Sequence, residues 1–223
     1  MQPIRLGIMG FGRVGRQLYQ LAVQDERFDV VAISDIGIAG ILHNLLTKTD
    51  HDLDVNLENN YLVSERGRTR LMSINRPTET PWDVFEVDVV IEATGRFCQL
   101  ADLTPHIENG AARVVLSALP EEEIDRVILY GVNEADASAA DQIISAGSAS
   151  TTATALALKI ITDAFAVEQA TMTSVHAYTS DQSLQDYAGP DYRRSRSGAK
   201  NIIPNVTPAL HWVQNVLPEL DGK

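Results

Sequence analysis

The sequence has a single cysteine, Cys98, and therefore cannot form an internal disulfide, which agrees with a reducing compartment. It also lacks any run of about 18 apolar residues, the length that a membrane-spanning helix needs, and its first residues carry no signal-peptide pattern. Its 14 glycines, 9 prolines and 44% apolar residues exclude the collagen-like, disordered and disulfide-stapled classes. We therefore expect a cytoplasmic globular protein of one or two domains from its 223 residues.

The sequence has few basic residues: it contains 18 Lys and Arg but 30 Asp and Glu, which gives a formal net charge of -12. An acidic excess repels nucleic acid and anionic lipid unless basic residues are locally clustered. Only Arg193, Arg194 and Arg196 are clustered, and they suggest a small anion site. We therefore expect no nucleic-acid partner and no membrane association.

Apolar periodicity in the first half of the chain predicts strands alternating with helices. Apolar residues alternate over 4–8, recur at helical spacing over 16–23, and form a short β-branched run at 30–33 that is typical of a buried parallel strand. Further strands are expected at 61–63, 69–73, 87–93, 112–117 and 126–130, and helices at 38–46 and 101–108. This alternation predicts an α/β fold with a doubly wound parallel sheet of the Rossmann type.

The remainder of the chain has a different pattern, which predicts a second domain. A long helix is expected at about 150–165, a strand at 171–178 and a polar segment with glycine and arginine at 179–200. We place the boundary so that the domains are residues 1–147 and 148–223.

A glycine motif lies between the first strand and the first helix. Gly10-Phe11-Gly12-Arg13-Val14-Gly15 matches G-x-G-x-x-G, and Asp35 ends the next strand, about 20 residues beyond the motif as in dinucleotide-binding domains. The glycines permit a tight turn, the helix start offers N–H groups to a pyrophosphate, and the carboxylate binds ribose hydroxyls. Such a segment can also be a plain turn at a helix start. Asp35 would repel a 2'-phosphate, so the pattern favours NAD over NADP.

This motif and several later segments resemble the phosphorylating glyceraldehyde-3-phosphate dehydrogenases, in the same order along the chain. The later segments are Glu92-Ala93-Thr94-Gly95-Arg96-Phe97, Ser117-Ala118, Tyr130-Gly131-Val132-Asn133, Val175-His176-Ala177 and Asn201-Ile202-Ile203-Pro204. Residues 178–198 also resemble the closely related erythrose-4-phosphate dehydrogenases. The resemblance implies that residues 148–223 are part of an α+β substrate domain, and that NAD contacts the glycine motif, Asp35, Thr94, Gly95 and Ser117.

The resemblance breaks at the position of the catalytic cysteine. Where the family has S-N-A-S-C-T-T-N, residues 145–152 read S-A-G-S-A-S-T-T, so that Ala149 takes the place of the nucleophile. A methyl group cannot attack an aldehyde, and the neighbouring Ser150 lacks the thiolate fraction that makes a cysteine reactive at neutral pH. Cys98 is distant along the chain and is interpreted as a free thiol near a strand end.

One histidine and several hydroxyl groups match other site residues of the family. His176 corresponds to the base that pairs with the cysteine, although a lone histidine is more often structural. Ser148, Ser150 and Thr207 correspond to the inorganic-phosphate site, but would serve equally as helix N-caps. Two further matches, Thr179 and Arg196, lie near the substrate and inorganic phosphates in the family, although a solvated arginine face would look the same. The other histidines, His43, His51, His106 and His211, are interpreted as surface or packing residues.

Smaller departures concern the cofactor. Met9 and Ser34 stand where the family has Asn, and Asp50-His51-Asp52-Leu53 replaces its usual D-S-x-H-G loop. The sequence also stops where the family continues, which is expected of a fragment or of a truncated paralogue.

The resemblance implies a glycolytic type of reaction: NAD-dependent oxidation and phosphorylation of a phosphorylated aldose, with inorganic phosphate as the second substrate. It also implies a homotetramer in which residues 178–198 reach a neighbouring subunit. Without the nucleophile we expect the covalent step to be blocked, which leaves open whether this chain is an enzyme. The alternative is a non-catalytic NAD-binding or regulatory paralogue. No metal site is expected.

Overall fold

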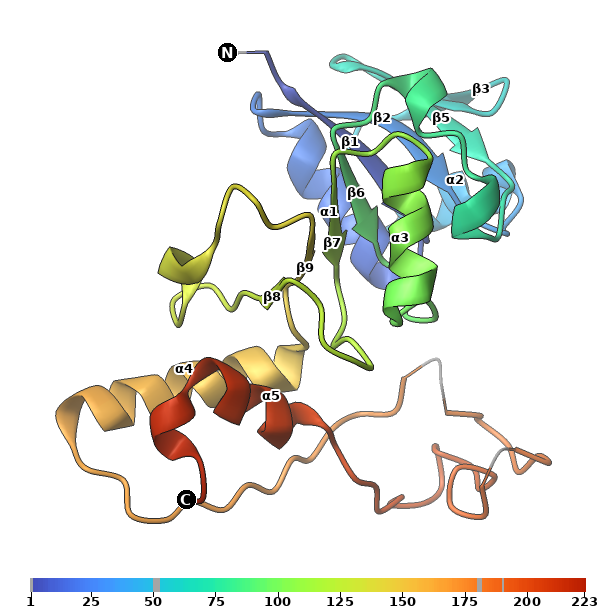
Figure 1. Cartoon of the computed structure of the whole chain (residues 1–223). Helices are drawn as coiled ribbons and strands as arrows, with labels where there is room; N and C mark the ends of the chain where they lie inside the picture. Colours follow the sequence, from blue (N-terminus) through green and yellow to red (C-terminus); the bar gives the residue numbers. More distant parts are fainter. Residues whose placement is uncertain (1, 50–52, 180–181, 190) are drawn as a thin grey trace.

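The computed structural model describes residues 2–49, 53–179, 182–189 and 191–223 and contains one nine-stranded sheet with helices packed around it (Figure 1). The strands are β1 (Ile4–Met9), β2 (Phe28–Ser34), β3 (Asn56–Glu58), β4 (Tyr61–Ser64), β5 (Gly67–Met72), β6 (Val89–Glu92), β7 (Arg113–Leu116), β8 (Arg126–Val127) and β9 (Ile143–Ser145). The helices are α1 (Arg13–Val23), α2 (Ala39–Thr49), α3 (Leu100–Glu108), α4 (Ala149–Ala164) and α5 (Ala209–Val216).

The sheet confirms the predicted α/β class. Its order is β3-β4-β5-β2-β1-β6-β7-β9-β8, and all pairs from β5 to β8 are parallel. Strand β1 lies between β2 and β6, so the order in which successive strands are added to the sheet reverses at β1, and the carboxyl ends of these three parallel strands lie at the same edge. This is the switch point at which open α/β sheets bind ligands.

One edge of the sheet differs from the wholly parallel sheet that the sequence predicted. Strands β3, β4 and β5 form an antiparallel meander, and β3 lies in a segment where the sequence analysis expected no strand. Asn59 and Asn60 connect β3 to β4 with φ values of 47° and 62°, as a two-residue type I' hairpin turn requires.

The sheet is covered on both faces. On one face the cluster of buried side chains includes Ile8 and Ile33 of the sheet, Tyr19 of α1 and Leu46 of α2. On the other face Met9 and Val90 pack around Trp82, and α3 adds a neighbouring cluster around Leu103. Helices α1 and α3 therefore lie on opposite faces, as Figure 1 shows and as double winding requires.

Helices α4 and α5 pack side by side beyond the β8–β9 edge of the sheet (Figure 1). Their shared core contains Ala155 of α4, Trp212 and Val213 of α5, and Leu129 from the segment after β8. The long helix predicted at 150–165 is confirmed, whereas the sequence analysis did not foresee α5.

The strand predicted at 171–178 is wrong. This segment belongs to no sheet, and the described residues between α4 and α5 contain neither helix nor strand. Val175 is 95% exposed, and no described strand lies beside this segment to pair with its N–H and C=O groups. A β-branched sequence pattern alone cannot make a strand, because strand hydrogen bonds need a neighbour.

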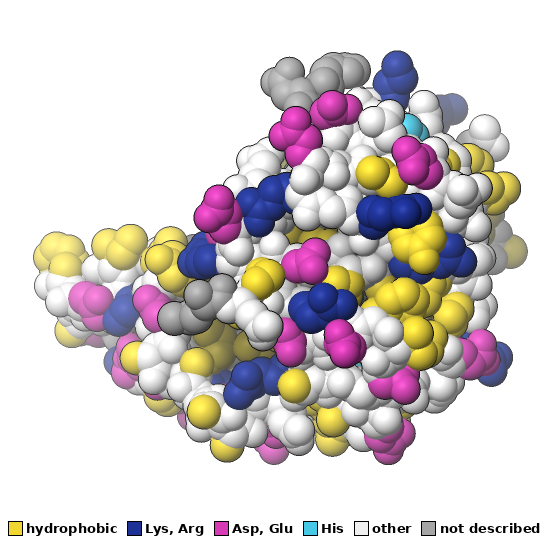
Figure 2. Space-filling view, turned by 90° about the horizontal axis from the view of Figure 1, so that it is seen from above, with side chains coloured by type: hydrophobic (Ala, Val, Ile, Leu, Met, Phe, Trp, Pro, Cys, Tyr) yellow, Lys and Arg dark blue, Asp and Glu magenta, His cyan; other side chains and the backbone are white. Residues whose placement is uncertain are grey.

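No helix among the described residues is both long and apolar enough to cross a bilayer. On the face shown in Figure 2, acidic and basic side chains are interspersed, and neither sign forms a continuous patch.

Candidate functional site

The glycine motif forms the turn after β1 and the first residues of α1, and each of its glycines has a different environment. Gly10 has a φ of 90°, and a Cβ atom placed on it would lie 2.6 Å from the backbone N of Thr94. A Cβ on Gly15 would lie 2.1 Å from the carbonyl oxygen of Gly10, whereas Gly12 faces open space. Gly10 and Gly15 therefore permit close backbone packing, and Gly12 leaves room for a ligand.

Helix α1 begins directly after this turn and presents free backbone N–H groups. Gly12 is its N-cap, with no side-chain cap, and there is no acidic residue in the first turn. The first N–H groups of a helix have no intrahelical acceptor, and together with the helix dipole they favour an anion. This arrangement suits a pyrophosphate.

Asp35 lies directly after β2 and holds the turn from the neighbouring strand. Its Oδ2 accepts a hydrogen bond from the backbone N of Phe11 at 2.6 Å, and its Oδ1 accepts one from the backbone N of Gly37 at 2.7 Å. Each carboxylate oxygen has further acceptor capacity. The carboxylate can therefore hold the loop and still accept hydrogen bonds from ligand hydroxyls.

A cavity of about 170 Å³ lies at the carboxyl ends of β1, β2 and β6. It is lined by Met9, Gly10, Gly12, Ser34, Asp35, Ile36, Ile74, Asn75, Ala93, Thr94, Arg96 and Phe97. Drug-sized ligands occupy roughly 300–1,000 Å³, so this cavity encloses only part of a dinucleotide and the remainder would lie along the open surface.

The other predicted cofactor residues are not among those that line this cavity. The Phe11 side chain is buried and makes an edge-to-face contact with Tyr19, so only its backbone faces the turn. Arg13 and Val14 are exposed on the first turn of α1. Gly95 has a φ of 68°, and Ser117 donates its backbone N–H to the carbonyl of Glu92 after β7.

Two lining residues, Ile74 and Asn75, were missed by the sequence analysis. They follow β5, and the Ser34 hydroxyl donates a hydrogen bond to the carbonyl of Ile74 at 2.8 Å. This hydrogen bond joins the end of β2 to the segment after β5. No sequence motif marks the segment after β5.

These observations fit NAD. The turn has an open glycine, the helix start offers unpaired N–H groups, and the carboxylate of Asp35 lies on the wall of the cavity. A carboxylate in that place accepts hydrogen bonds from ribose hydroxyls and repels a 2'-phosphate.

Ala149 is the first residue of α4 and is exposed. The preceding residue, Ser148, is the N-cap: its Oγ accepts a hydrogen bond from the backbone N of Thr151 at 3.1 Å. The hydroxyls of Ser148 and Thr151 are 2.8 Å apart, and Ser150 is half-buried at the second helical position. The position that resembles the family's nucleophile thus lies at a capped helix start and carries only a methyl group.

His176 lies in the exposed segment between α4 and α5. Its Nδ1 is 2.5 Å from the carbonyl oxygen of Ala177, the next residue. Among the described residues, no hydrogen bond joins the His176 ring to the start of α4. A methyl group at residue 149 offers the imidazole of His176 no hydrogen-bond partner.

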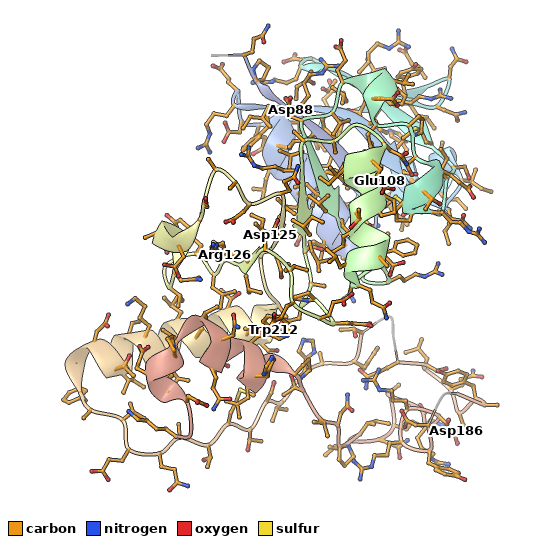
Figure 3. All side chains as sticks on the ribbon, viewed as in Figure 1. Asp88, Glu108, Asp125, Arg126, Asp186 and Trp212 are labelled. Atoms are coloured by element: carbon orange, nitrogen blue, oxygen red, sulfur yellow. The ribbon has the colours of Figure 1, made fainter. Side chains whose placement is uncertain are left out.

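The predicted phosphate ligands fall into two groups. Thr207 precedes Pro208, the N-cap residue of α5, and its Oγ1 accepts a hydrogen bond from the backbone N of Ala209 at 3.2 Å. Thr179 and Arg196 lie in the irregular segment, and Arg196 pairs with Asp186 at 2.9 Å with both side chains more than half exposed. Figure 3 shows Asp186 in this segment, away from the sheet.

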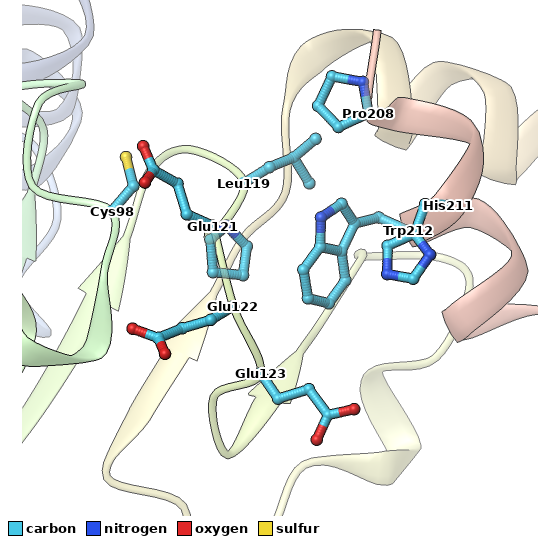
Figure 4. Close-up of a pocket in the computed structure, with 9 residues that line it drawn as sticks. Cys98, Leu119, Glu121, Glu122, Glu123, Pro208, His211 and Trp212 are labelled. Atoms are coloured by element: carbon cyan, nitrogen blue, oxygen red, sulfur yellow. The ribbon is translucent and has the colours of Figure 1, made fainter.

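Cys98 is not a substitute nucleophile. It is 8% exposed, and burial together with the carboxylate of Glu121 raises the pKa of its thiol to about 11. At neutral pH the thiol stays protonated, and the thiolate is the reactive form. Cys98 lines the edge of a cavity of about 590 Å³, in which Trp212 and His211 of α5 face the loop of Glu121 (Figure 4).

The remaining histidines have varied surroundings. The Nε2 of His43 is 2.7 Å from the carbonyl oxygen of Val55, and His211 stacks edge-on against Trp212. His51 lies outside the described residues. His106, interpreted above as a surface or packing residue, is completely buried and hydrogen-bonded to Trp82 and Glu92. The described residues contain no group of three or more potential metal ligands.

Comparisons with known proteins agree in both parts of the chain. Residues 4–100 match the family model "Glyceraldehyde 3-phosphate dehydrogenase, NAD binding domain", and residues 148–223 match "Glyceraldehyde 3-phosphate dehydrogenase, C-terminal domain". The chain is 40% identical over 226 residues to glyceraldehyde-3-phosphate dehydrogenase 1 of Bacillus subtilis, with 99% of this chain and 67% of the relative covered. Similar proteins of Priestia megaterium and Mycobacterium leprae are 40% and 38% identical over 227 and 231 residues, covering 99% of this chain and 67% and 68% of the relatives.

Proposed function

Since the chain belongs to the glyceraldehyde-3-phosphate dehydrogenase family, we propose that it binds NAD at the carboxyl ends of β1, β2 and β6 and does not carry out the covalent step on an aldehyde. The observation that carries this proposal is the pairing of an intact dinucleotide turn with Ala149 at the start of α4.

The residues of the glycine turn and Asp35 have distinct roles in this proposal. The N–H groups at the start of α1 face the pyrophosphate, and Gly12 allows its close approach. The Asp35 carboxylate accepts hydrogen bonds from the adenosine ribose and excludes NADP. When bound, NAD supplies a hydride acceptor.

The covalent step fails for a local chemical reason. A thiol that adds to an aldehyde carbon needs a lone pair on sulfur, and residue 149 has none. The remaining thiol of this chain, Cys98, is buried and protonated at neutral pH. The anion-binding groups do not depend on the nucleophile: the Ser148 side chain caps α4, and the Thr207 hydroxyl accepts a hydrogen bond from the first residue of α5. We propose that they, together with Ser150, Thr179 and Arg196, bind the phosphate groups of a phosphorylated aldose and inorganic phosphate.

Further proposals follow from the family. The chain divides into residues 1–147 and 148–223, supported by the end of β9 at Ser145 and the start of α4 at Ala149. The protein is cytoplasmic and forms a homotetramer through residues 178–198. The almost complete exposure of Tyr192, at 97%, supports a contact with another subunit there.

The test compares the chain with its Ala149→Cys variant. Calorimetry with NAD should detect binding to both, because residue 149 is outside the dinucleotide turn. NADH formation from glyceraldehyde 3-phosphate and inorganic phosphate should be absent in the unchanged chain. Phosphate-dependent turnover by the unchanged chain would refute the proposal, and NAD binding without turnover would agree with a regulatory role.

A further inference from the structure

A continuous row of buried polar groups runs across the face of the sheet that carries α3. Trp82, Glu92 and His106 are all 0% exposed. The indole Nε1 of Trp82 lies 2.9 Å from Nδ1 of His106, and Nε2 of His106 lies 3.3 Å from Oε2 of Glu92. Burying a polar group costs folding free energy unless its hydrogen bonds are made. The partners of these three side chains therefore determine whether the row stabilises the fold.

The direction of each hydrogen bond follows from the donor inventory. An indole N–H can only donate, so Nδ1 of His106 must accept and carries no proton in this bond. Nε2 of His106 then bears the hydrogen of the neutral ring and donates it to Glu92. The tautomer of His106 is therefore determined by Trp82.

The far end of the row reaches the wall of the dinucleotide cavity. The second oxygen of Glu92, Oε1, accepts hydrogen bonds from the backbone N of Thr94 at 2.8 Å and from the Thr94 hydroxyl. The Thr94 oxygen accepts in turn from the backbone N of Arg96 at 3.1 Å. The N–H and the hydroxyl of Thr94 thus both donate to Glu92, and these hydrogen bonds fix the turn that follows β6.

Both ends of the row lie close to glycines, one in β1 and one in the turn that follows it. A Cβ on Gly10 would lie 2.6 Å from the backbone N of Thr94, and a Cβ on Gly7 would lie 2.7 Å from the Trp82 ring. A displacement of Thr94 would therefore change the packing against Gly10, the first glycine of the dinucleotide turn.

We propose that His106 is a positioning residue for the dinucleotide pocket. It orients Glu92, which holds Thr94 against Gly10 and keeps the N–H and hydroxyl of Thr94 turned away from the bound NAD. Thr94 on this account shapes the cavity wall rather than donating to the cofactor. The inference rests on the proposed function, because it assumes that NAD occupies this cavity.

Two substitutions at one position separate the two hydrogen bonds. In His106→Gln the longer side chain can place its amide N–H near the former Nε2 and still donate to Glu92. In His106→Asn the shorter side chain stays near Trp82 and cannot reach Glu92. We expect His106→Asn to weaken NAD binding roughly tenfold, as loss of a buried hydrogen bond to a charged group implies, and His106→Gln to restore most of the affinity.

Leu103→Ala is the matched control, because Leu103 is 0% exposed on the same helix, α3, and has no part in the row. It should lower the unfolding temperature without changing NAD affinity. Calorimetry with NAD and thermal unfolding are measured on all four proteins. The nitrogen NMR signals of His106, recorded without NAD, should show the Nε2–H tautomer in the unchanged chain.

The outcomes distinguish the inference from the proposed function. If the unchanged chain does not bind NAD, the proposed function itself is overturned. Equal NAD affinity in the unchanged chain and in His106→Asn would overturn the positioning role alone. The same conclusion would follow if Leu103→Ala lost as much NAD affinity as His106→Asn for the same loss of stability. An Nδ1–H tautomer would contradict the donor and acceptor assigned to each hydrogen bond of His106.

Discussion

The carboxylate of Asp35 accepts a hydrogen bond from the backbone N–H of Phe11 at 2.6 Å, which ties the end of β2 to the glycine turn after β1. The residue that would recognise the ribose is therefore also part of the turn that would hold the pyrophosphate. A change of Asp35 affects cofactor choice and turn geometry together, so the two effects need separate variants.

Asp35→Asn should reduce the preference for NAD over NADP while keeping an oxygen that can accept from Phe11. Removing the negative charge should lower the ratio of the two affinities by roughly a hundredfold, because juxtaposed like charges cost a few kcal/mol and about 1.4 kcal/mol corresponds to tenfold. Calorimetry with both cofactors measures the ratio. Asp35→Ala should also weaken the binding of NAD, because it leaves the N–H groups of Phe11 and Gly37 without this acceptor. A parent protein that already prefers NADP would contradict the role given to Asp35.

Gly10→Ala and Gly12→Ala form a matched pair within one turn. Gly10→Ala forces a side chain into a φ of 90° and against Thr94, so it should cost about 1–3 kcal/mol of stability or more and abolish NAD binding. Gly12→Ala places its methyl group in open space. It should therefore leave the unfolding temperature nearly unchanged and weaken NAD binding by obstructing the pyrophosphate. Thermal unfolding and calorimetry give the two readouts, and equal destabilisation by both substitutions would refute this division.

The Ala149→Cys variant should react with iodoacetamide at neutral pH at the new thiol, because residue 149 is exposed at a helix start, a place that favours thiolate. Cys98 should remain unlabelled in both proteins under these conditions, because the pKa of its thiol is raised to about 11. Its labelling should increase as the pH rises towards that value. Peptide mass spectrometry locates the label. Rapid modification of Cys98 at pH 7 in the folded protein would contradict its burial and the raised pKa of its thiol.

Asp141→Asn should lower stability near pH 6 and have less effect in strong acid. The Arg126 guanidinium, whose Nε lies 2.9 Å from Oδ2 of Asp141, lowers the pKa of that carboxyl, and the backbone N of Ser138 lowers it further. Because the folded-state pKa is below the unfolded-state pKa, the contribution is complete above the latter and is lost as pH falls through the former.

Denaturant unfolding between about pH 2 and pH 6 measures this difference. Asp163→Asn is the control, because Asp163 is 65% exposed and pairs only across one turn of α4 with Lys159; such surface pairs contribute about 0–1 kcal/mol. A stability difference for Asp141→Asn that stays constant over the whole pH range would exclude the ionic explanation. Arg126 is the first residue of β8, and Figure 3 shows it between the central strands and helix α4.

The sequence alone was sufficient for the parts of the molecule whose signals are local. The period of apolar residues indicated β1, α1 and β2, and glycine spacing with Asp35 indicated the dinucleotide turn, because adjacent residues dictate strand, turn and helix there. The absence of a thiol at residue 149 is likewise a property of the sequence, and no packing can supply one.

The tertiary structure decided what depends on neighbours distant in the chain. The segment 171–178 has a strand-like composition and forms no strand, because a strand exists only through hydrogen bonds to a partner. The row from Trp82 through His106 to Glu92 was invisible in the sequence for the same reason. Its residues are separated along the chain, and only the packing of α3 on the sheet places the imidazole between an indole that must donate and a carboxylate that must accept.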